Sequence, residues 1–457
     1  MTMRAQTQGV ERRIAAGYAL LREETLPDVA VRAAEQAILD WLGCLLIGAE
    51  APPALAIAAA HSAEIGSGVA TCFVGPSRCY PGLAALISGT ASHTLELDDI
   101  YSPGLYHPSV CVMSAALAAS QLAGVKGDTF LRSVIAGYEI SNRIGAGLNP
   151  DHYKYWHTTG TVGTLGATIA AATALSLSEA QVGHAIAHAT SMAAGLQQAF
   201  RSDGMTKPLH AGRAAEAGLL AARIAKAGLI GSSDMISGPV GLAQAMSHGR
   251  DISNRFDDLL QDWTVTRSMF KRFSACGHTF APVDLAIELK QQTDIDPAEI
   301  QRVDVATYAT ALKVAGISQP KSPFEAKFSI PFGMAATLLG HDLTDPTSFE
   351  KLHADRSIAA LIPAVHVSED AETTAAFPAL RGARVSITMK NGKVHAGYAP
   401  TRKGEPANPL LPGDLERKFR RLVEATSRPQ TATAWMTWVK SLAKGAELAP
   451  DALPVSQ

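Results

Sequence analysis

The chain has 457 residues, which is enough for two to four domains of ordinary size. Lys and Arg number 40 against 42 Asp and Glu, giving a net charge of -2. The chain therefore lacks the overall positive charge with which dedicated nucleic-acid binders hold a phosphate backbone. Hydrophobic residues make up 47% and charged residues 18%, which excludes an intrinsically disordered chain and predicts large buried cores.

The cysteines and the N-terminal segment bear on the cellular compartment. The five cysteines are odd in number and scattered, so they do not predict a disulfide framework. The first residues, MTMRAQTQGVERRIAAGYALL, contain early charges and lack the uninterrupted apolar stretch of a signal peptide. No later window approaches about 18 apolar residues without a charge. We therefore expect a cytoplasmic protein without a membrane partner.

Residues 1–269 are rich in Ala, Leu and Gly, and their apolar positions recur at the spacing of amphipathic helices. The predicted helices cover 28–47, 81–96, 109–123, 128–147, 161–175, 178–194 and 209–228. Small residues, as in GTVGTLGATIAAATAL, allow neighbouring helices to approach closely. We predict that 1–269 forms the first part of an all-helical domain.

Strand patterns appear mainly after residue 270. Residues 301–308 alternate apolar and polar side chains, and 383–398 contains two alternating runs around Asn391 and Gly392. Asn-Gly between alternating runs is the strongest short-range signal for a β-hairpin. Helical patterns accompany these strands at 281–292 and 325–339. Residues 270–405 are therefore predicted to form a smaller α+β domain.

Helical patterning returns in residues 406–457, for example in DLERKFRRLVEATS and TATAWMTWVKSL. The most economical topology lets this segment rejoin the first helical domain. The predicted fold class is accordingly mainly α, with a large all-helical domain built from both chain ends and a smaller inserted α+β domain.

Common cofactor signatures are absent from the sequence, which contains no phosphate loop, no GxGxxG between strand and helix, no HExxH and no CxxC. No GxSxG indicates a hydrolase nucleophile. His184 and His188 lie four residues apart in a helical pattern, but a pair without a carboxylate partner more often packs in a core or interface. We predict neither a cofactor nor a metal.

A titratable residue stands at the start of four predicted helices: His107, His157, Lys207 and His278. Free backbone N–H groups and the helix dipole make such a terminus attractive to anions. A single histidine in this position is more often a cap or a surface residue. Four together favour a pocket for a ligand that carries several carboxylates.

Charged residues lie beside two of these helix starts. The acidic cluster Glu96, Asp98 and Asp99 comes shortly before His107. Lys271 and Arg272 come shortly before His278. The ordinary interpretation of the acidic cluster is a solvated turn, and that of Lys271 and Arg272 is a charged loop. Because both runs lie next to the histidines, we expect them to orient the substrate or to move its protons.

Six segments in this order resemble the signature blocks of the MmgE/PrpD family: HTLELDD, YHPS, WHTTGTVGTLGA, GMTKPLHAGRAAEAG, FKRFSACGHTFAPVDLAIEL and EAKFSIPF. That family includes 2-methylcitrate dehydratases, cis-aconitate decarboxylases and an iminodisuccinate epimerase. The resemblance implies a helical domain made from both chain ends, a smaller α+β domain, a homodimer, and catalysis without a metal or organic cofactor.

The resemblance also implies which residues form the site. Catalytic roles are expected for His107, His157, Lys207, His278 and Asp99. Substrate-binding roles are expected for Glu96 and Asp98 from the resemblance, and for Tyr101, Lys271 and Arg272 from their positions beside the acidic cluster and His278. We further expect His157 to act on the substrate and His107 to be held by a neighbouring carboxylate, which favours its charged form.

The reactions of this family share the formation or quenching of a carbanion next to a carboxylate. Such a step needs a positioned base or acid, for which histidine is suited near neutral pH, and cations that stabilise the developing charge. The leading expectation is a hydro-lyase of the 2-methylcitrate dehydratase type. An epimerase of an imino- or amino-dicarboxylate is the close alternative, since Glu96 and Tyr101 depart from the family's usual residues. Decarboxylation of cis-aconitate, or a catalytically idle helical dimer that binds polycarboxylates, are further alternatives.

Overall fold

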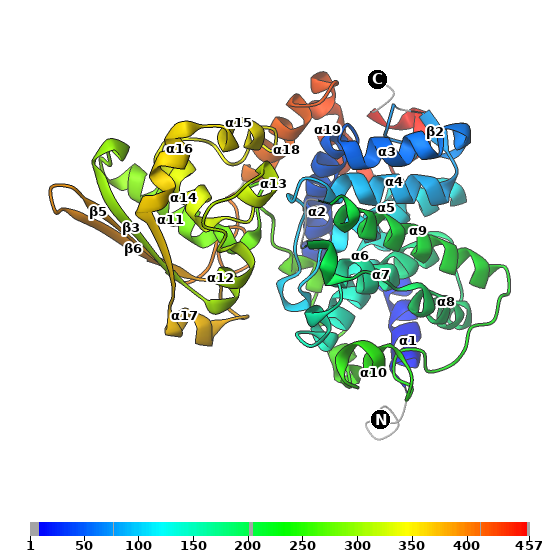
Figure 1. Cartoon of the computed structure of the whole chain (residues 1–457). Helices are drawn as coiled ribbons and strands as arrows, with labels where there is room; N and C mark the ends of the chain where they lie inside the picture. The colour runs from blue at the N-terminus through cyan, green and yellow to red at the C-terminus, as the bar shows by residue number, and fades with distance from the viewer. Residues whose placement is uncertain (1–8, 76, 201–203, 412, 455–457) are drawn as a thin grey trace. The chain divides into compact units, whose positions relative to one another are not determined.

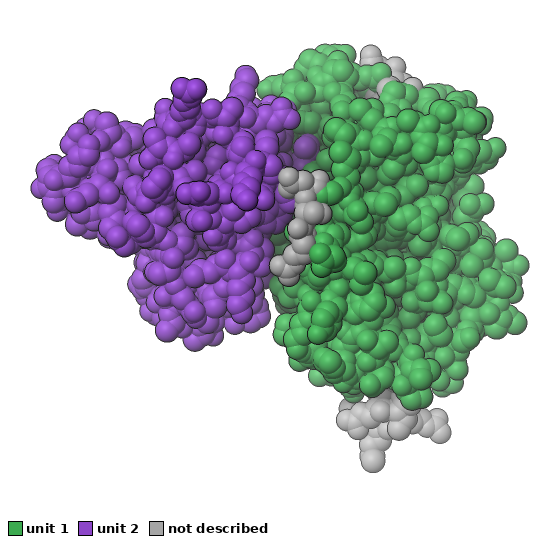
Figure 2. Space-filling model, in the orientation of Figure 1, with its two compact units in different colours: residues 1–94, 98–268, 415–457 green, residues 95–97, 269–414 purple. Residues whose placement is uncertain are grey.

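The computed structural model describes residues 9–75, 77–200, 204–411 and 413–454, and Figure 1 shows its elements. Residues 1–8 of the N-terminal segment considered above as a possible signal lie outside the described residues. The chain folds into two compact units (Figure 2). Unit 1 consists of Met1–Thr94, Asp98–Ser268 and Leu415–Gln457, and unit 2 of Leu95–Leu97 and Met269–Asp414.

Unit 1 is built from helices and one short β-hairpin. The helices are α1 (Val10–Glu23), α2 (Asp28–Gly48), α3 (Pro52–Ala60), α4 (Pro81–His93), α5 (Pro108–Ala123), α6 (Gly127–Leu148), α7 (Thr158–Ala174), α8 (Glu179–Met192), α9 (Thr206–Lys226), α10 (Leu242–Ser247), α18 (Asp414–Glu424) and α19 (Ala432–Ser441). The hairpin pairs β1 (Ile65–Cys72) with β2 (Ser77–Cys79) in antiparallel fashion. Sequence periodicity did not predict this hairpin, because IGSGVATC is interrupted by glycines and does not alternate.

Helices α4, α5, α7 and α9 pack against one another in unit 1. Their close approach depends on glycine. A Cβ on Gly89 of α4 would lie 2.8 Å from the Cα of Gly212 on α9, and a Cβ on Gly212 would lie 2.3 Å from the carbonyl oxygen of Leu86. The backbones of α4 and α9 therefore touch without intervening side chains. This packing sets the distance between the end of α4 and the start of α9.

The C-terminal helices α18 and α19 belong to unit 1. Lys418 of α18 places its Nζ 2.5 Å from Oδ1 of Asp40 on α2, and both side chains are largely buried. Trp435 and Trp438 of α19 are also buried, and their rings meet edge to face at 5.5 Å. Residues from the two ends of the chain therefore complete one core.

Unit 2 contains a four-stranded sheet in the order β4-β3-β5-β6. Its strands are β3 (Ile300–Thr307), β4 (Val365–Glu369), β5 (Ala383–Met389) and β6 (Val394–Ala399). β3 pairs parallel with β4 and antiparallel with β5, which in turn pairs antiparallel with β6. The turn between β5 and β6 contains Asn391 and Gly392, and Gly392 has a φ of +82°.

Helices α11 and α14 lie against the sheet (Figure 1). Their apolar side chains form one core with those of the strands. Alternate residues of β3, Val303 and Val305 among them, are buried in this core, while the residues between them are more exposed. The helices of unit 2 are α11 (Phe280–Gln292), α12 (Ala309–Ala315), α13 (Pro323–Ala326), α14 (Ile330–Leu338), α15 (Phe349–His353), α16 (Arg356–Leu361) and α17 (Ala371–Ala376).

The mainly α fold class with a small α+β portion is confirmed. Two local predictions were wrong in detail. The helix predicted over 325–339 is split into α13 and α14, because the Ser329 side chain caps α14 by accepting a hydrogen bond from the N–H of Phe332. Lys207 does not precede its helix but lies within the first turn of α9, which begins at Thr206.

Among the described residues, no single helix is long and apolar enough to cross a bilayer. Helices α2 and α3 meet these criteria only as a pair, and they are bent by 70° relative to each other.

Candidate functional site

Four helix ends in unit 1 carry the predicted site residues or, in one case, a histidine that was not assigned to the site. Helix α4 ends at His93, α5 and α7 begin directly after His107 and His157, and α9 carries Lys207 in its first turn. Both His107 and His157 have extended backbone conformations at the N-cap position, and neither side chain accepts a capping hydrogen bond. The ordinary alternative of a capping histidine therefore does not describe these two residues.

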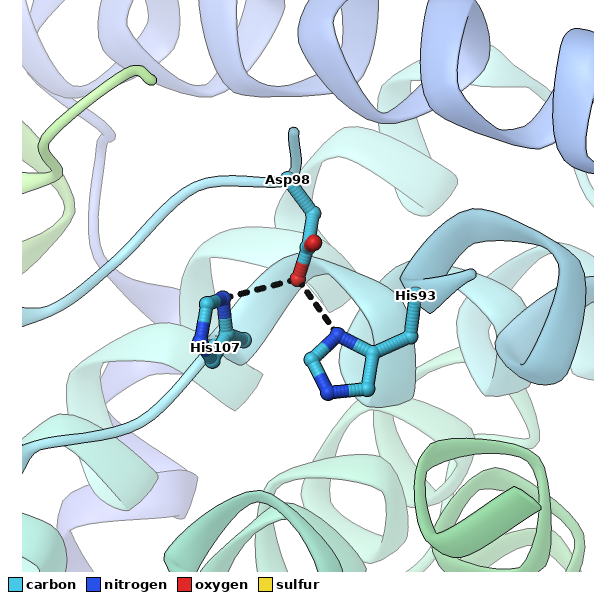
Figure 3. A group of neighbouring side chains, drawn as sticks. All are labelled: His93, Asp98 and His107. Carbon is cyan, nitrogen blue, oxygen red and sulfur yellow. Dashed lines mark hydrogen bonds and ion pairs between the residues drawn. The ribbon is translucent and has the colours of Figure 1, made fainter. Parts of the chain in front are cut away.

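Asp98 joins two histidines (Figure 3). Its Oδ2 lies 2.8 Å from Nδ1 of His93 and 2.8 Å from Nδ1 of His107. The Asp98 and His93 side chains are fully buried, whereas His107 retains 14% of its side-chain exposure. The two imidazole rings are 4.8 Å apart, centre to centre. The structure thus supplies the carboxylate that was expected beside His107.

The charge of Asp98 is stabilised by these histidines. Burial alone would raise the pKa of Asp98, but the imidazoles of His107 and His93 hold it well below its ordinary value. The carboxylate therefore stays ionised and presents its negative charge to both imidazoles. This cluster is suited to hold a proton that it later donates.

His157 has a different environment, although its ring stacks at 5.5 Å on that of His93. Burial lowers the pKa of His157 well below its ordinary value, and the neighbouring His93 and Lys207 act in the same direction. Its Nδ1 lies 3.0 Å from Nδ1 of His210, and its ring meets that of Phe200 edge to face at 4.7 Å. His157 is therefore a neutral imidazole, the form that accepts a proton.

Lys207 is buried, with 7% of the residue exposed. Its ammonium nitrogen lies 5.2 Å from the centre of the Phe200 ring, within cation–π distance. The same charge contributes to lowering the pKa of His157. A buried cation beside a neutral imidazole is suited to bind a carboxylate.

Asp99 and Tyr101 contact the protein core. The N–H of Ser109 and the hydroxyl of Tyr138 donate hydrogen bonds to the Asp99 carboxylate at 3.1 and 2.8 Å. Burial, assisted by the charge of Asp40, raises the pKa of Asp99 to about 7. Tyr101 is buried in the hydrophobic core, where its ring meets that of Tyr106. These contacts support the segment that carries His107, and the predicted roles of Asp99 in catalysis and Tyr101 in substrate binding stay predictions.

Unit 2 contains the remaining predicted residues. Nζ of Lys271 lies 3.2 Å from Oε2 of Glu96, and both side chains are buried. Glu96 adopts a φ of +59°, a left-handed conformation that costs a residue with a side chain about 1–2 kcal/mol. From the sequence, Glu96 and Lys271 were each expected to bind the substrate. The structure makes them partners of each other.

Two further predicted residues of unit 2 also have protein partners. Arg272 contacts the carboxylate of Asp284 on α11 at 3.1 Å and lies over the Phe273 ring. Nδ1 of His278 lies 2.6 Å from the hydroxyl of Tyr308. Burial lowers the pKa of His278 well below its ordinary value, and the charges of Arg381 and Arg402 add to this effect. His278 is therefore neutral.

A buried carboxylate also joins two cations in unit 2. Oε1 of Glu405 lies 3.2 Å from a guanidinium nitrogen of Arg381 and 2.7 Å from one of Arg402. All three residues are less than 10% exposed. Because guanidinium groups do not lose their protons in proteins near neutral pH, both arginines of this cluster keep their charge there.

His184 and His188, which were considered as metal ligands, contact backbone groups of the protein. His184 Nδ1 accepts a hydrogen bond from the N–H of Gly231, and His188 Nε2 lies 3.1 Å from the carbonyl oxygen of Leu229. Among the described residues, potential ligand atoms within 4.8 Å of one another occur on His93, Asp98 and His107. A divalent ion there would have to replace the protons that these groups share. The expectation of a metal-free site stays a prediction.

Sequence reasoning missed His210 and gave His93 no role of its own. His210 follows Lys207 by three residues on the same helix, so the two share a helix face. His93 lies five residues before Asp98, a spacing that neither a helix nor a strand period brings together, and only the HTLELDD segment marks it. The helical spacing could have identified His210, whereas the partnership of His93 with Asp98 required the fold.

The chain is similar to known proteins over most of its length. The MmgE/PrpD N-terminal domain matches residues 12–255, and the MmgE/PrpD C-terminal domain matches residues 273–443. Cis-aconitate decarboxylase of Homo sapiens is 27% identical over 416 residues, 86% of this chain and 84% of the relative. The enzyme of the same name from Mus musculus is 27% identical over 92% of this chain and 88% of the relative. A cis-aconitate decarboxylase-like protein of Aspergillus oryzae is 23% identical over 89% and 88%.

Proposed function

The chain belongs to the MmgE/PrpD family, and we propose that it is an acid/base lyase acting on a carbon next to a carboxylate of a di- or tricarboxylic acid. One observation carries this proposal. A neutral histidine, His157, lies beside the histidines His93 and His107, which share the ionised carboxylate of Asp98. A base and an acid of the same residue type are therefore available at adjacent positions.

Lys207 completes the proposed machinery of unit 1. A carbanion next to a carboxylate places negative charge on the carboxylate oxygens, and a buried ammonium group stabilises that charge more strongly than water does. In this proposal Lys207 binds the substrate carboxylate, His157 accepts or returns the proton at carbon, and His107 donates a proton. Asp98 holds His107 in its protonated form.

Decarboxylation of cis-aconitate is the first reaction to test. Relatives that cover more than four fifths of the chain carry that name. In such a reaction a C–C bond breaks, CO2 departs, and the electron pair left on carbon takes up one proton. In this proposal His157 returns that proton to carbon, while the charge of Lys207 stabilises the carbanion.

Dehydration of 2-methylcitrate is a second candidate with its own supporting observation. Elimination of water requires a base for the C–H proton and an acid for the departing hydroxyl at the same time. Neutral His157 and carboxylate-held His107 provide both. An imino-dicarboxylate epimerase also needs two acid/base groups, and the same experiment distinguishes it.

The experiment is incubation of the purified protein with each acid in deuterium oxide, followed by proton NMR. Loss of CO2, loss of water, and exchange with racemisation give different spectra. We expect turnover of at least one acid, and loss of that turnover in His157→Asn. Binding without turnover or exchange of any of these acids would instead support a polycarboxylate-binding protein and contradict the proposal.

A further inference from the structure

His157 and His210 form a hydrogen-bonded pair of unusual type. The two Nδ1 atoms are 3.0 Å apart, so one ring must donate and the other must accept. When the Nδ1 of His157 carries the proton, its Nε2 is a free base. When the Nδ1 of His210 carries it, Nε2 of His157 must carry a proton and becomes a donor. The proton position within the pair therefore decides whether His157 acts as base or acid.

His210 also lines a cavity of about 560 Å³ in unit 1. The walls come from α7, α9 and the segment 192–199, and they include Thr164, Leu196, Thr206 and Arg213. Ala194 and Gly195 of this segment lie close to α7 and to the His210 ring. A Cβ on Gly195 would lie 3.3 Å from Nδ1 of His210, and a Cβ on Gly160 would lie 2.4 Å from the carbonyl oxygen of Ala194. His210 is thus partly exposed on one side and bonded to fully buried His157 on the other.

We propose that His210 is a proton-relay residue, which carries protons between water in this cavity and the buried imidazole of His157. The proposal rests on the proposed acid/base function of His157 and adds to it the route by which that residue is reset. A decarboxylation that consumes one proton per turnover, or an elimination that stores one on the base, requires such a route to solvent.

The relay moves one proton from water to the substrate through three transfers. A proton from water enters at Nε2 of His210, because Nδ1 of that ring already faces His157. The Nδ1 proton of His210 then passes to Nδ1 of His157, and the Nε2 proton of His157 passes to the substrate carbanion. One proton enters from water and one leaves to carbon, so both imidazoles end neutral with their tautomers exchanged. The starting tautomers return when water in the emptied site protonates Nε2 of His157, its Nδ1 proton passes back to Nδ1 of His210, and Nε2 of His210 releases its proton to the cavity. The reverse sequence removes a proton that His157 has abstracted.

The charges around the pair favour transfer over storage. Three basic residues and one carboxylate face the pair. The basic residues are Lys207, which shares α9 with His210, His93 at the end of α4, and His107 before α5. The carboxylate is that of Asp98, which contacts both His93 and His107. Burial, with the charges of His93 and Lys207 acting in the same direction, lowers the pKa of His210 to about 4. A proton therefore spends little time on the pair, as a relay requires.

Chemical rescue tests the proposal. His210→Ala removes the relay and enlarges the cavity, so kcat should fall at least about tenfold, because general acid–base groups contribute about 10²–10⁴-fold. Added imidazole should restore part of this loss, and the restored rate should vary with the pKa of substituted imidazoles. His210→Gln keeps a hydrogen-bonding side chain without relay ability, and it should lose kcat without rescue. His188→Gln, on a histidine that contacts the backbone at Leu229, is the matched control and should behave as wild type.

Loss of activity in His210→Ala that no imidazole restores would overturn the relay in favour of a purely structural role, and so would wild-type kcat in that variant. A second measurement separates this inference from the proposed function. Nitrogen-15 NMR of histidine-labelled protein reports the ring tautomers without substrate. We expect two neutral rings with one protonated Nδ1, and a changed His157 tautomer in His210→Gln. If the wild type turns over no acid but shows this pair, the proposed function is wrong. If two independent, unbonded rings are found, the relay is wrong whatever the reaction.

Discussion

Each unit buries a carboxylate between two basic side chains, but the two clusters differ in what those side chains can do. In unit 1, Asp98 lies between His93 and His107, and in unit 2, Glu405 lies between Arg381 and Arg402. Histidine gives up its proton near neutral pH, whereas arginine does not. The cluster of unit 1 is therefore suited to proton transfer, and that of unit 2 supplies permanent charge.

The difference also shows how the same sequence pattern can have two outcomes. His107 lies directly before α5, and His278 lies in a short 3₁₀ turn two residues before α11. Asp98 favours the charged form of His107, while burial together with Arg381 and Arg402 keeps His278 neutral. The partner that decides the charge lies nine residues away along the chain in one case and more than a hundred residues away in the other. The following variants test each side of this comparison.

Lys207→Ala should have the largest effect on turnover. If the buried ammonium group of Lys207 stabilises the substrate carboxylate, its removal should lower kcat about 10²–10³-fold. The measurement is steady-state kinetics with the acid identified by NMR. Lys226→Ala, at the opposite end of the same helix, is the control and should retain activity. Near-normal kcat in Lys207→Ala would remove this residue from the mechanism.

Asp98→Asn should follow, with a loss of about 10²-fold in kcat. The substitution preserves shape but removes the negative charge that holds protons on His93 and His107. The acid-requiring limb of the pH–rate profile should therefore move to lower pH. A variant that keeps both its rate and its profile would show that the proton donor lies outside this cluster.

Glu405→Gln should act on stability more than on chemistry. It leaves two buried guanidinium groups without their shared carboxylate, a change that costs about 3–5 kcal/mol in unfolding free energy for buried ion pairs. Denaturant unfolding measures this loss. If the folded variant instead lost as much kcat as Asp98→Asn, the division of tasks between the two clusters would be wrong.

Asp98 and Asp99 should contribute to stability with opposite dependence on pH. The folded-state pKa of Asp98 is lowered, so its contribution is fully present above about pH 4, the unfolded value, and is lost as the pH falls below it. The folded-state pKa of Asp99 is raised to about 7, so stability falls as the pH rises from about 4 to 7. Asp99→Asn should flatten that fall, which amounts to at most about 4 kcal/mol. Melting temperatures of the wild type, Asp98→Asn and Asp99→Asn from pH 3 to 8 test both predictions. The same change in pH dependence in the two variants would contradict them.

Chelation should have the smallest effect, since the proposed steps use only side-chain acids, bases and cations. Activity is expected to survive exhaustive dialysis against EDTA. If EDTA abolished activity and a divalent ion restored it, His93, Asp98 and His107 would be the ligands to substitute first.

The sequence was informative where the signal was local. Apolar periodicity located most helices of unit 1, and Asn391 with Gly392 identified the hairpin of β5 and β6. Helix starts at His107 and His157 were likewise visible, because Pro108 and the following helical patterns mark them. The resemblance to a family then brought His107, His157 and Lys207 into one predicted site.

Partnerships between distant residues could not be predicted in this way. The bond of His157 to His210 spans 53 positions, and the pairing of Lys271 with Glu96 spans 175. Both depend on how helices and loops pack, which residue types alone do not specify. The β1–β2 hairpin was missed for a local reason, since its glycines interrupt the alternation on which strand prediction depends.

The contact of Asp40 with Lys418 joins residues 378 positions apart and has a consequence for biosynthesis. A ribosome releases the chain from the N-terminus, so α2 emerges long before the helix that supplies its buried partner. All of unit 2 is translated in that interval. The early helices must therefore wait with an exposed apolar face, the state in which nascent chains aggregate or recruit chaperones. Slow translation ahead of residue 415 would lengthen this exposure, and rapid completion of the last forty or so residues would shorten it.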